Sequence, residues 1–234
     1  MIINESDHRD KFDGKNELAF LRNYQKPRVG DFYRKNAKSI FVVRDPGMRL
    51  ISLYVNKFVQ RSGYLDIFKN YYKLTGMRPE KATFRDFLCN YVQRFPVKKL
   101  DPHLLPQYMH LRRTRYNSPV RLEHLCDDMR RVVGDYYAEK YFMKKSNSTS
   151  DKYSADERIV VDVTSDELND LFVNVLKVPS PDKFFCSELD EVVSTVYGGD
   201  AALYGDVCKA YEVISDKKTP IIDARKYQSW MSWL

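Results

Sequence analysis

The chain has 234 residues, a length that suits one globular domain, and its 43% apolar and 14% aromatic content excludes a disordered or low-complexity protein. No apolar run approaches the roughly 20 residues that a membrane-spanning helix needs, and the N-terminal residues lack the apolar segment of a signal peptide. We therefore expect a single domain over residues 1–234, with no membrane contact of its own and no signal or anchor in this chain.

The net charge of +7 is unevenly distributed along the chain. Residues 1–130 hold 26 basic and 14 acidic residues, a net +12, whereas residues 131–234 hold 13 and 18, a net −5. The basic half is expected to face an anion, and the candidates are nucleic acid, an acidic polysaccharide and a phosphorylated cofactor.

The four cysteines are widely spaced, at Cys89, Cys126, Cys186 and Cys208, and they form no Cys-x-x-Cys pair. This spacing argues against a zinc site, and we expect no metal. Buried free thiols and two disulfides, with three possible connectivities, are both open at this point.

The first readable unit is a strand followed by a turn and a helix. Residues 39–43 are mostly β-branched or aromatic without polar alternation, which predicts a strand buried on both faces, as in a parallel sheet. Asp45 is placed to cap the following helix, and Pro46 suits its first position. Apolar residues at helical spacing extend that helix over about 46–58.

Two further helices are predicted in an aromatic-rich stretch. One covers residues 64–75 and is ended by Gly76, and the other covers 83–94, opened by a capping box from Thr83 to Asp86. The aromatic side chains fall at helical spacing, so we interpret them as core rather than as a surface that stacks bases or sugars.

The rest of the chain also alternates strand and helix. A short strand is expected at 120–122, and helices are expected at 125–137, 165–176 and 187–197. The polar stretch at about 144–153 predicts an exposed loop within the domain. Together these elements predict an α/β fold, with a parallel sheet flanked by helices.

The strongest chemical signal is carried by residues 43–54, Val-Arg-Asp-Pro-Gly-Met-Arg-Leu-Ile-Ser-Leu-Tyr. Arg44 at the strand end, Arg49 and Ser52 can converge near the helix N-terminus. A phosphate there would meet the positive helix end, a guanidinium and a hydroxyl. The alternative is structural, with Arg44 capping the strand beside Asp45 and Arg49 lying in solvent.

This segment closely resembles the 3′-phosphate-binding motif of sulfotransferases, in particular the Golgi carbohydrate sulfotransferases of the chondroitin 4-sulfotransferase and HNK-1 sulfotransferase type. Three other stretches resemble that family in the same order. Residues 17–24 are similar to the segment before its strand, and Asp101-Pro-His-Leu-Leu-Pro-Gln107 resembles its Asp-x-His-Trp-x-Pro-Gln motif, with Leu104 in place of Trp. Residues 196–205 are similar to its closing Tyr-x-x-Asp-x-x-x-Phe-Gly pattern.

The resemblance implies a P-loop-like sulfotransferase architecture that transfers a sulfuryl group from 3′-phosphoadenosine 5′-phosphosulfate (PAPS) to a carbohydrate hydroxyl. By position, Arg44 and Ser52 would hold the 3′-phosphate of this nucleotide co-substrate, with Arg49 as a supporting cation. The resemblance also implies the Golgi lumen, where the acceptor patterns that begin at Asn4 and Asn147 would permit glycosylation.

His103 is the expected general base, because an imidazole can accept a proton at neutral pH. The alternative is a loop histidine packed between prolines. Gln107 lies four residues on and would share its face if the segment is helical, where it could orient a sugar hydroxyl. Arg112, Arg113 and Arg115 follow directly and suit an acidic glycan, although a solvated surface turn would have the same composition.

The family's loop for the 5′-phosphosulfate, of the form Pro-Lys-x-x-x-Thr/Ser, has no counterpart in the sequence. We therefore expect an architecture that is incomplete at its N-terminal edge, or a degenerate relative. Three functions follow: a PAPS-dependent carbohydrate sulfotransferase, a catalytically impaired relative that binds an anionic glycan or nucleotide, and a basic nucleic-acid-binding domain. Only the basic half of the chain supports the third, so nucleic acid is the least favoured partner.

Overall fold

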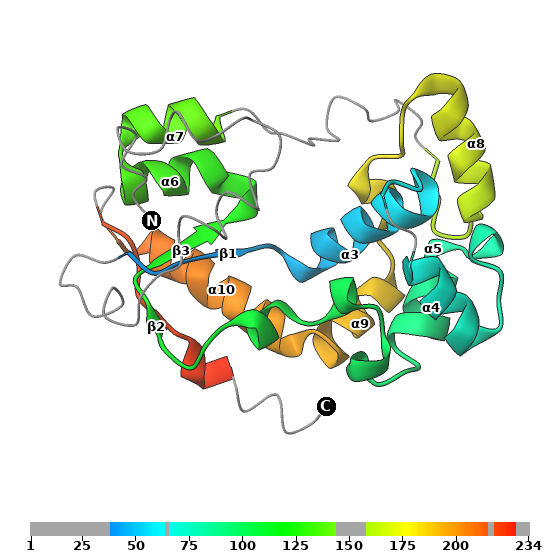
Figure 1. Cartoon of the computed structure of the whole chain (residues 1–234), viewed down its shortest axis with the longest axis horizontal. Coiled ribbons are helices and arrows are strands. Elements are labelled where there is room, and N and C mark those ends of the chain that lie inside the picture. The colour runs from blue at the N-terminus through cyan, green and yellow to red at the C-terminus, as the bar shows by residue number, and fades with distance from the viewer. Residues whose placement is uncertain (1–37, 64–65, 144–157, 215–217, 228–234) are drawn as a thin grey trace, which may run out of the picture.

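The computed structural model describes residues 38–63, 66–143, 158–214 and 218–227 (Figure 1). The polar stretch at 144–153, both acceptor asparagines and residues 17–24 lie outside this part of the chain, so the structure does not test what was predicted for them.

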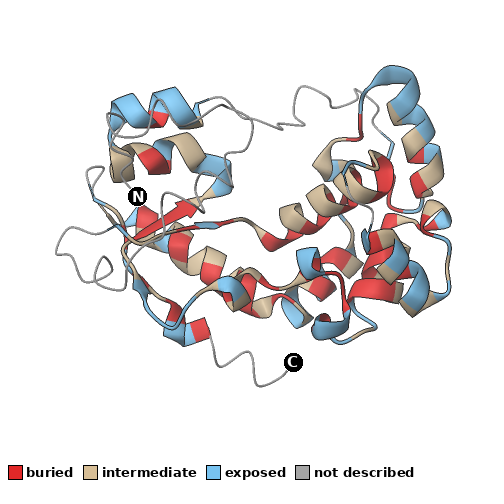
Figure 2. Ribbon diagram, viewed as in Figure 1, coloured by how far each residue is buried: buried red, intermediate tan, exposed pale blue. Residues whose placement is uncertain are grey.

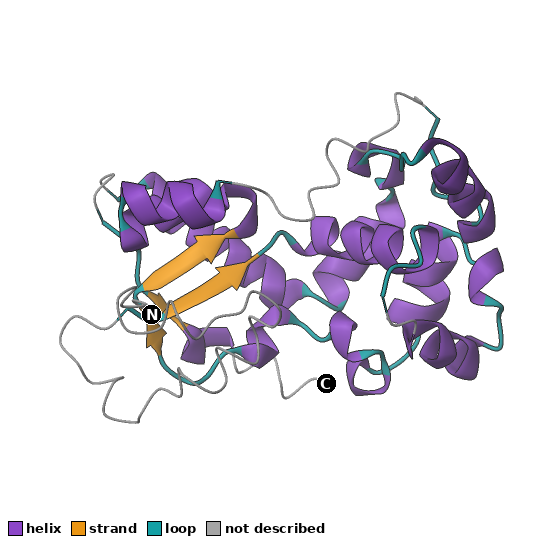
Figure 3. Cartoon of the chain, turned by 45° about the horizontal axis from the view of Figure 1, so that its top comes forward, coloured by secondary structure: helices purple, strands orange, loops and turns teal. Residues whose placement is uncertain are grey.

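A small parallel sheet lies toward one end of the molecule (Figure 3). It pairs β1 (Ile40–Val43) with β3 (Ser118–Arg121), which confirms a strand at both predicted places. The predicted burial on both faces of β1 is wrong, because Phe41 and Val43 are buried while Val42 is 51% exposed. Burial in β1 therefore alternates, as it does in a strand with one covered face.

Helices lie on both sides of this sheet (Figure 1). α6 (Leu125–Val133) and α7 (Asp135–Phe142) share one apolar cluster with Val120 of β3. α10 (Gly198–Glu212) shares a different cluster with Phe41 of β1. The described residues thus form a mixed α/β fold in which helices flank a small parallel sheet, as predicted.

A second, antiparallel pair joins β2 (Arg115–Tyr116) to β4 (Ile222–Asp223). This pair lies beside the N-terminal end of β1, where the hydroxyl of Ser39 donates to the carbonyl oxygen of Arg115 over 3.5 Å. The carboxyl end of β1 points away from it, toward the helices.

A helical core fills the other end of the molecule (Figure 2). Its helices are α3 (Pro46–Tyr54), α4 (Asp66–Thr75), α5 (Phe84–Asp86), α8 (Ser165–Val175) and α9 (Ser187–Thr195), with π-helical segments at Val55–Val59 and Phe87–Val92. The rings of Tyr54, Phe58 and Phe87 are fully buried, with centres 5.2 to 5.6 Å apart. The aromatic stretch therefore forms core, as its spacing predicted.

The local capping signals form as predicted. The Asp45 carboxylate accepts from the N–H of Met48 over 2.8 Å at the start of α3, and Thr83 and Asp86 form a reciprocal capping box at α5. Gly76 follows α4 with a φ of +71°, in the region that favours glycine. Because these contacts join near neighbours in sequence, sequence alone predicts them well.

Two helical predictions need correction. The helix expected over 125–137 ends at Val133, where Gly134 adopts a φ of +86°, and a separate helix, α7, follows. No helix was predicted beyond residue 197, yet α10 begins at Gly198 and is the longest described helix. Three glycines weaken its helical signal, and burial against the sheet stabilises it.

Replacing Gly134 with Ala is expected to lower the free energy of unfolding by about 1–3 kcal/mol, because φ +86° and ψ 165° is a region that side chains other than glycine rarely adopt. Urea unfolding measures the loss. Gly205→Ala is the matched control, since a Cβ at Gly205 in α10 meets nothing within 4 Å. The control is expected to be neutral or to gain up to about 1 kcal/mol, and an equal loss in both variants would contradict the conformational cause.

The four cysteines, all of which lie among the described residues, are free thiols. In the described part of the chain, no helix is long and apolar enough to cross a membrane. The same residues contain no group of three or more His, Cys, Asp and Glu side chains placed to hold a metal ion.

Candidate functional site

The site begins where β1 ends and α3 starts. Arg44 is the first residue after β1, and Asp45 caps α3. The backbone of Arg44 is bonded twice by the side chain of Gln107: the Arg44 N–H donates to Oε1 over 2.9 Å, and Nε2 donates to the Arg44 carbonyl over 2.8 Å. The amide of Gln107 thus joins the segment that contains His103 to the end of β1.

The guanidinium of Arg44 forms an ion pair with the carboxylate of Glu123. Its Nε lies 3.4 Å from Oε1 of Glu123, and the side chain of Arg44 is 27% exposed. Nε is buried and makes no hydrogen bond within the described residues. The structural alternative paired Arg44 with Asp45, whereas the described structure places Glu123 next to it. A buried, cationic nitrogen without a hydrogen bond fits a site for an anion.

Ser52 lies in the second turn of α3 and is half-buried. No described residue accepts or donates a hydrogen bond at its hydroxyl, which leaves that group available to a ligand. It comes from the same strand, turn and helix as Arg44, but no hydrogen bond joins the two side chains in the described structure.

Arg49 does not lie in solvent, so the alternative of a solvated side chain is wrong. Its Nη2 donates to the carbonyl oxygens of His103 over 2.8 Å and Leu105 over 2.6 Å. Its Nη1 lies 3.5 Å from Oδ2 of Asp200, and the side chain is 20% exposed. The guanidinium is therefore directed at the segment that contains His103.

Asp200 is a buried carboxylate in the first turn of α10. It accepts from the backbone N–H of Gln107 over 2.8 Å and of Tyr108 over 3.0 Å. Burial raises the pKa of the Asp200 carboxyl, while these two donors and Arg49 act in the opposite direction. The sequence placed Asp200 in the closing pattern of the resemblance but gave it no role.

His103 lies in a 3-10 turn, and its ring is paired with a carboxylate. Nδ1 lies 2.6 Å from Oδ1 of Asp101, which is buried and also accepts from the His103 backbone N–H over 2.9 Å. The ring is 62% exposed. An ionised Asp101 requires the proton on Nδ1, so that Nε2 is left with a lone pair that can accept a proton.

His103 and Gln107 were expected to share a face only if their segment were helical, and that condition is not met. They lie in separate 3-10 turns, Pro102–Leu104 and Gln107–His110, because Leu105 is extended before Pro106. Gln107 nevertheless lies against the end of β1, through its bonds to the backbone of Arg44.

The arginines that follow His103 in sequence lie toward the opposite end of the sheet. Arg112, Arg113 and Arg115 are exposed, and Nε of Arg115 lies 3.5 Å from Oδ2 of Asp223 across the β2–β4 pair. Arg115 is beside the N-terminal end of β1, whereas Arg44 follows its carboxyl end. At about 3.3 Å per residue, the two ends are roughly 16 Å apart. The structure thus brings together Arg44, Arg49, His103 and Gln107, but not Arg115.

The site thus combines an arginine at a strand end, a capped helix and an Asp–His pair. A family model described as "Sulfotransferase family" matches residues 3–177, and the chain belongs to this family.

Among curated proteins, the chain is similar to carbohydrate sulfotransferase 14 of Mus musculus, with 32% identity over 114 residues. The alignment covers 46% of this chain and 30% of that relative, so the chain spans about a third of the length of the relative that it matches. No solved structure gives a significant match.

Proposed function

We propose that the protein transfers a sulfuryl group from PAPS to a carbohydrate hydroxyl. The observation that carries this proposal is the Asp101–His103 pair, an exposed imidazole with a carboxylate partner in a segment that Gln107 bonds to the end of β1. The family match supports sulfuryl transfer, and the relative named for carbohydrate sulfation supports the acceptor class. By the same resemblance, we propose one P-loop-like sulfotransferase domain that acts in the Golgi lumen.

The proposed ligands of the nucleotide 3′-phosphate are Arg44 and Ser52. Arg44 offers a guanidinium whose buried Nε has no hydrogen bond among the described residues, and Ser52 offers a hydroxyl without a partner there. The N-terminal end of α3 lies between them in sequence and adds its positive dipole.

In the proposed reaction, the acceptor hydroxyl forms a bond to sulfur as its proton passes to Nε2 of His103. The bond between sulfur and the bridging phosphate oxygen breaks, and adenosine 3′,5′-bisphosphate leaves. Asp101 holds the ring in the tautomer that accepts this proton and stabilises the imidazolium that forms.

The remaining predicted substrate residues have separate roles in this proposal. Both polar atoms of the Gln107 amide are bonded to Arg44, so we assign it to holding the His103 segment rather than to contacting sugar. An acidic glycan that contacts Arg115, and with it the neighbouring Arg112 and Arg113, would have to extend about 16 Å from the strand end, which is several sugar units. The proposal therefore favours a long, acidic acceptor.

A transfer assay with sulfur-labelled PAPS and a panel of neutral and acidic glycans tests the function. Label is expected in a carbohydrate acceptor, and calorimetric titration is expected to show binding of adenosine 3′,5′-bisphosphate. Bisphosphate binding without transfer to any glycan would support the impaired relative instead. Tight nucleic-acid binding with a steep salt dependence, and no bisphosphate binding, would support the third hypothesis.

Replacing Glu123 with Gln is expected to tighten bisphosphate binding by about two- to fivefold, because it removes a negative charge 3.4 Å from Arg44. Calorimetric titration measures the change. Glu139→Gln is the matched control, since Glu139 lies on α7 and its carboxylate is 3.5 Å from Arg130 of α6. Weaker binding in Glu123→Gln would show that the carboxylate orients Arg44 rather than competing with the phosphate.

A further inference from the structure

We infer that Arg49 and Asp200 are positioning residues, which together hold the His103 segment at a set distance from the nucleotide site. In this assignment Arg49 is not a ligand of the phosphate. The catalytic consequence rests on the proposed function, whereas the contacts themselves do not. Two facts carry the inference: the direction in which Arg49 donates, and the burial of Asp200.

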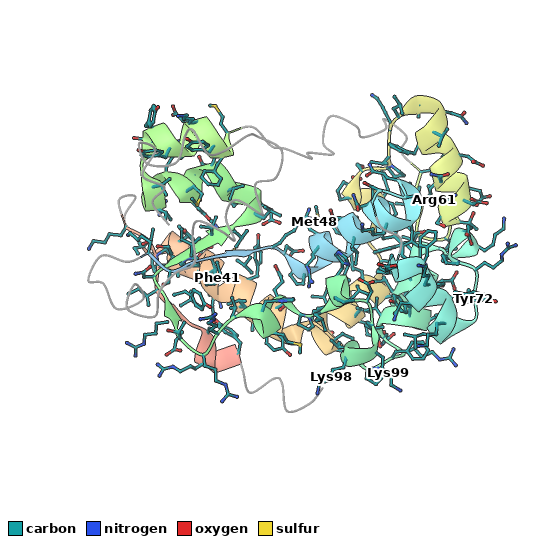
Figure 4. The ribbon with its side chains drawn as sticks, viewed as in Figure 1. Phe41, Met48, Arg61, Tyr72, Lys98 and Lys99 are labelled. Atoms are coloured by element: carbon teal, nitrogen blue, oxygen red, sulfur yellow. The ribbon has the colours of Figure 1, made fainter. Side chains whose placement is uncertain are left out.

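The guanidinium of Arg49 spans the backbone around His103. Its Nη2 donates to the carbonyls of residues 103 and 105, so it holds the residue that carries the imidazole and the residue two positions on. A guanidinium stays charged and presents its donors in a rigid fork, which suits two fixed carbonyl acceptors. Figure 4 labels Met48, the residue before Arg49, where α3 meets the end of β1.

Asp200, on α10, holds the next part of the same segment. Its two oxygens accept from the N–H groups of Gln107 and Tyr108, and Oδ2 faces Arg49. A fully buried carboxylate is costly unless it is paired and hydrogen-bonded, and here three donors compensate it. Its place in the first turn of α10 adds the favourable end of that helix dipole.

These contacts fix the His103 segment at several points. Arg49 binds two of its carbonyls, Asp200 binds two of its N–H groups, and Gln107 bonds to the backbone of Arg44. Side chains of α3 and α10 therefore both bind the backbone of the loop that carries the imidazole. A displacement of about 1 Å in a reacting group can cost roughly 10²-fold in rate.

The test uses Arg49→Gln and Asp200→Asn in the full chain. Each variant is expected to lower kcat for transfer by about 10²-fold, while KM for PAPS and the affinity for adenosine 3′,5′-bisphosphate change by less than about threefold. Arg49→Lys keeps the positive charge but changes the geometry of the donors. If Arg49 were a phosphate ligand, a lysine could preserve that contact and the rate. Because a lysine cannot reproduce the fork, kcat of this variant is expected to stay low.

Amide hydrogen exchange gives a readout that does not need activity. The N–H groups of Gln107 and Tyr108 are expected to exchange at least about tenfold faster in Asp200→Asn. Asp206→Asn is the matched control, because Asp206 lies on the same helix and accepts from Tyr227 and Lys226 instead. The control is expected to leave both this exchange and kcat unchanged.

Three results would overturn the inference. Arg49→Gln could lose bisphosphate affinity as far as Arg44→Ala does, which would make Arg49 a phosphate ligand. Asp200→Asn could leave amide exchange unchanged, or accelerate it while kcat stays at the parent value. If the parent chain transfers to no glycan, the proposed function fails, and exchange and bisphosphate binding still decide whether Arg49 and Asp200 hold the segment.

Discussion

Replacing His103 with Gln is expected to lower the rate of sulfuryl transfer by about 10²–10⁴-fold, because it removes the group that takes the acceptor proton in the proposed reaction. Binding of adenosine 3′,5′-bisphosphate is expected to stay at the parent affinity, since the ring does not contact Arg44 or Ser52 in the described structure. The measurement is kcat with sulfur-labelled PAPS beside a calorimetric titration.

His110→Gln is the matched control, since His110 is exposed in the following 3-10 turn and has no carboxylate partner in the described structure. It is expected to keep the parent rate. Asp101→Asn should lose part of what His103→Gln loses, because an amide donor would favour the wrong tautomer. A parent rate in His103→Gln would remove the proposed base.

The double variant Arg44→Ala, Ser52→Ala is expected to weaken bisphosphate binding by about 10²-fold or more, because charged hydrogen bonds contribute about 1.5–3 kcal/mol each. Titration of the variant against adenosine 3′,5′-bisphosphate measures the loss, and the affinity should depend less on salt as well.

Arg94→Ala is the control for the loss of a positive charge, since Arg94 is exposed near Phe95 and distant in sequence from the strand end. It should bind the bisphosphate as the parent chain does. Full binding in the double variant would refute the assignment of the 3′-phosphate site and leave the basic half of the chain without a defined ligand.

The strand, turn and helix around Arg44 could be predicted because their signals are local. Asp45 and Pro46 act on residues within one turn of themselves, and the apolar run before them reads as a strand without knowledge of its partner. The parallel pairing of β1 with β3 was expected only as a fold class. The exposure of Val42 could not be predicted, because it depends on which elements cover the sheet.

Only part of the candidate site could be predicted from the sequence. Arg44 and His103 could be named from the sequence because an arginine at a strand end and a histidine in a motif each indicate a chemical role without knowledge of their partners. The contact between Arg49 and Asp200 joins residues 151 positions apart in sequence, and sequence spacing does not predict contacts over such a separation. The Asp in the closing pattern was the available signal, but a pattern without geometry assigns no role.

The shared face of His103 and Gln107 was conditional on a helix, and that condition is not met. Two residues four apart face the same way only in a helix, and Pro102 and Pro106 instead start separate short turns. The sequence showed both prolines and left a loop histidine open as the alternative, but the shape of such a loop is set by segments that are distant in sequence.

The position of α10 late in the sequence means that the site is completed late in synthesis. Asp200 lies beyond residue 177, where the family match ends, and it is the last of the site residues to leave the ribosome. Until it emerges, the strand, the helix after it and the histidine segment have all been synthesised without the carboxylate that joins them. A nascent chain stopped at residue 177 would carry Arg44, Ser52 and His103 but neither Asp200 nor the closing pattern at 196–205, so the ability to transfer should arise late in synthesis.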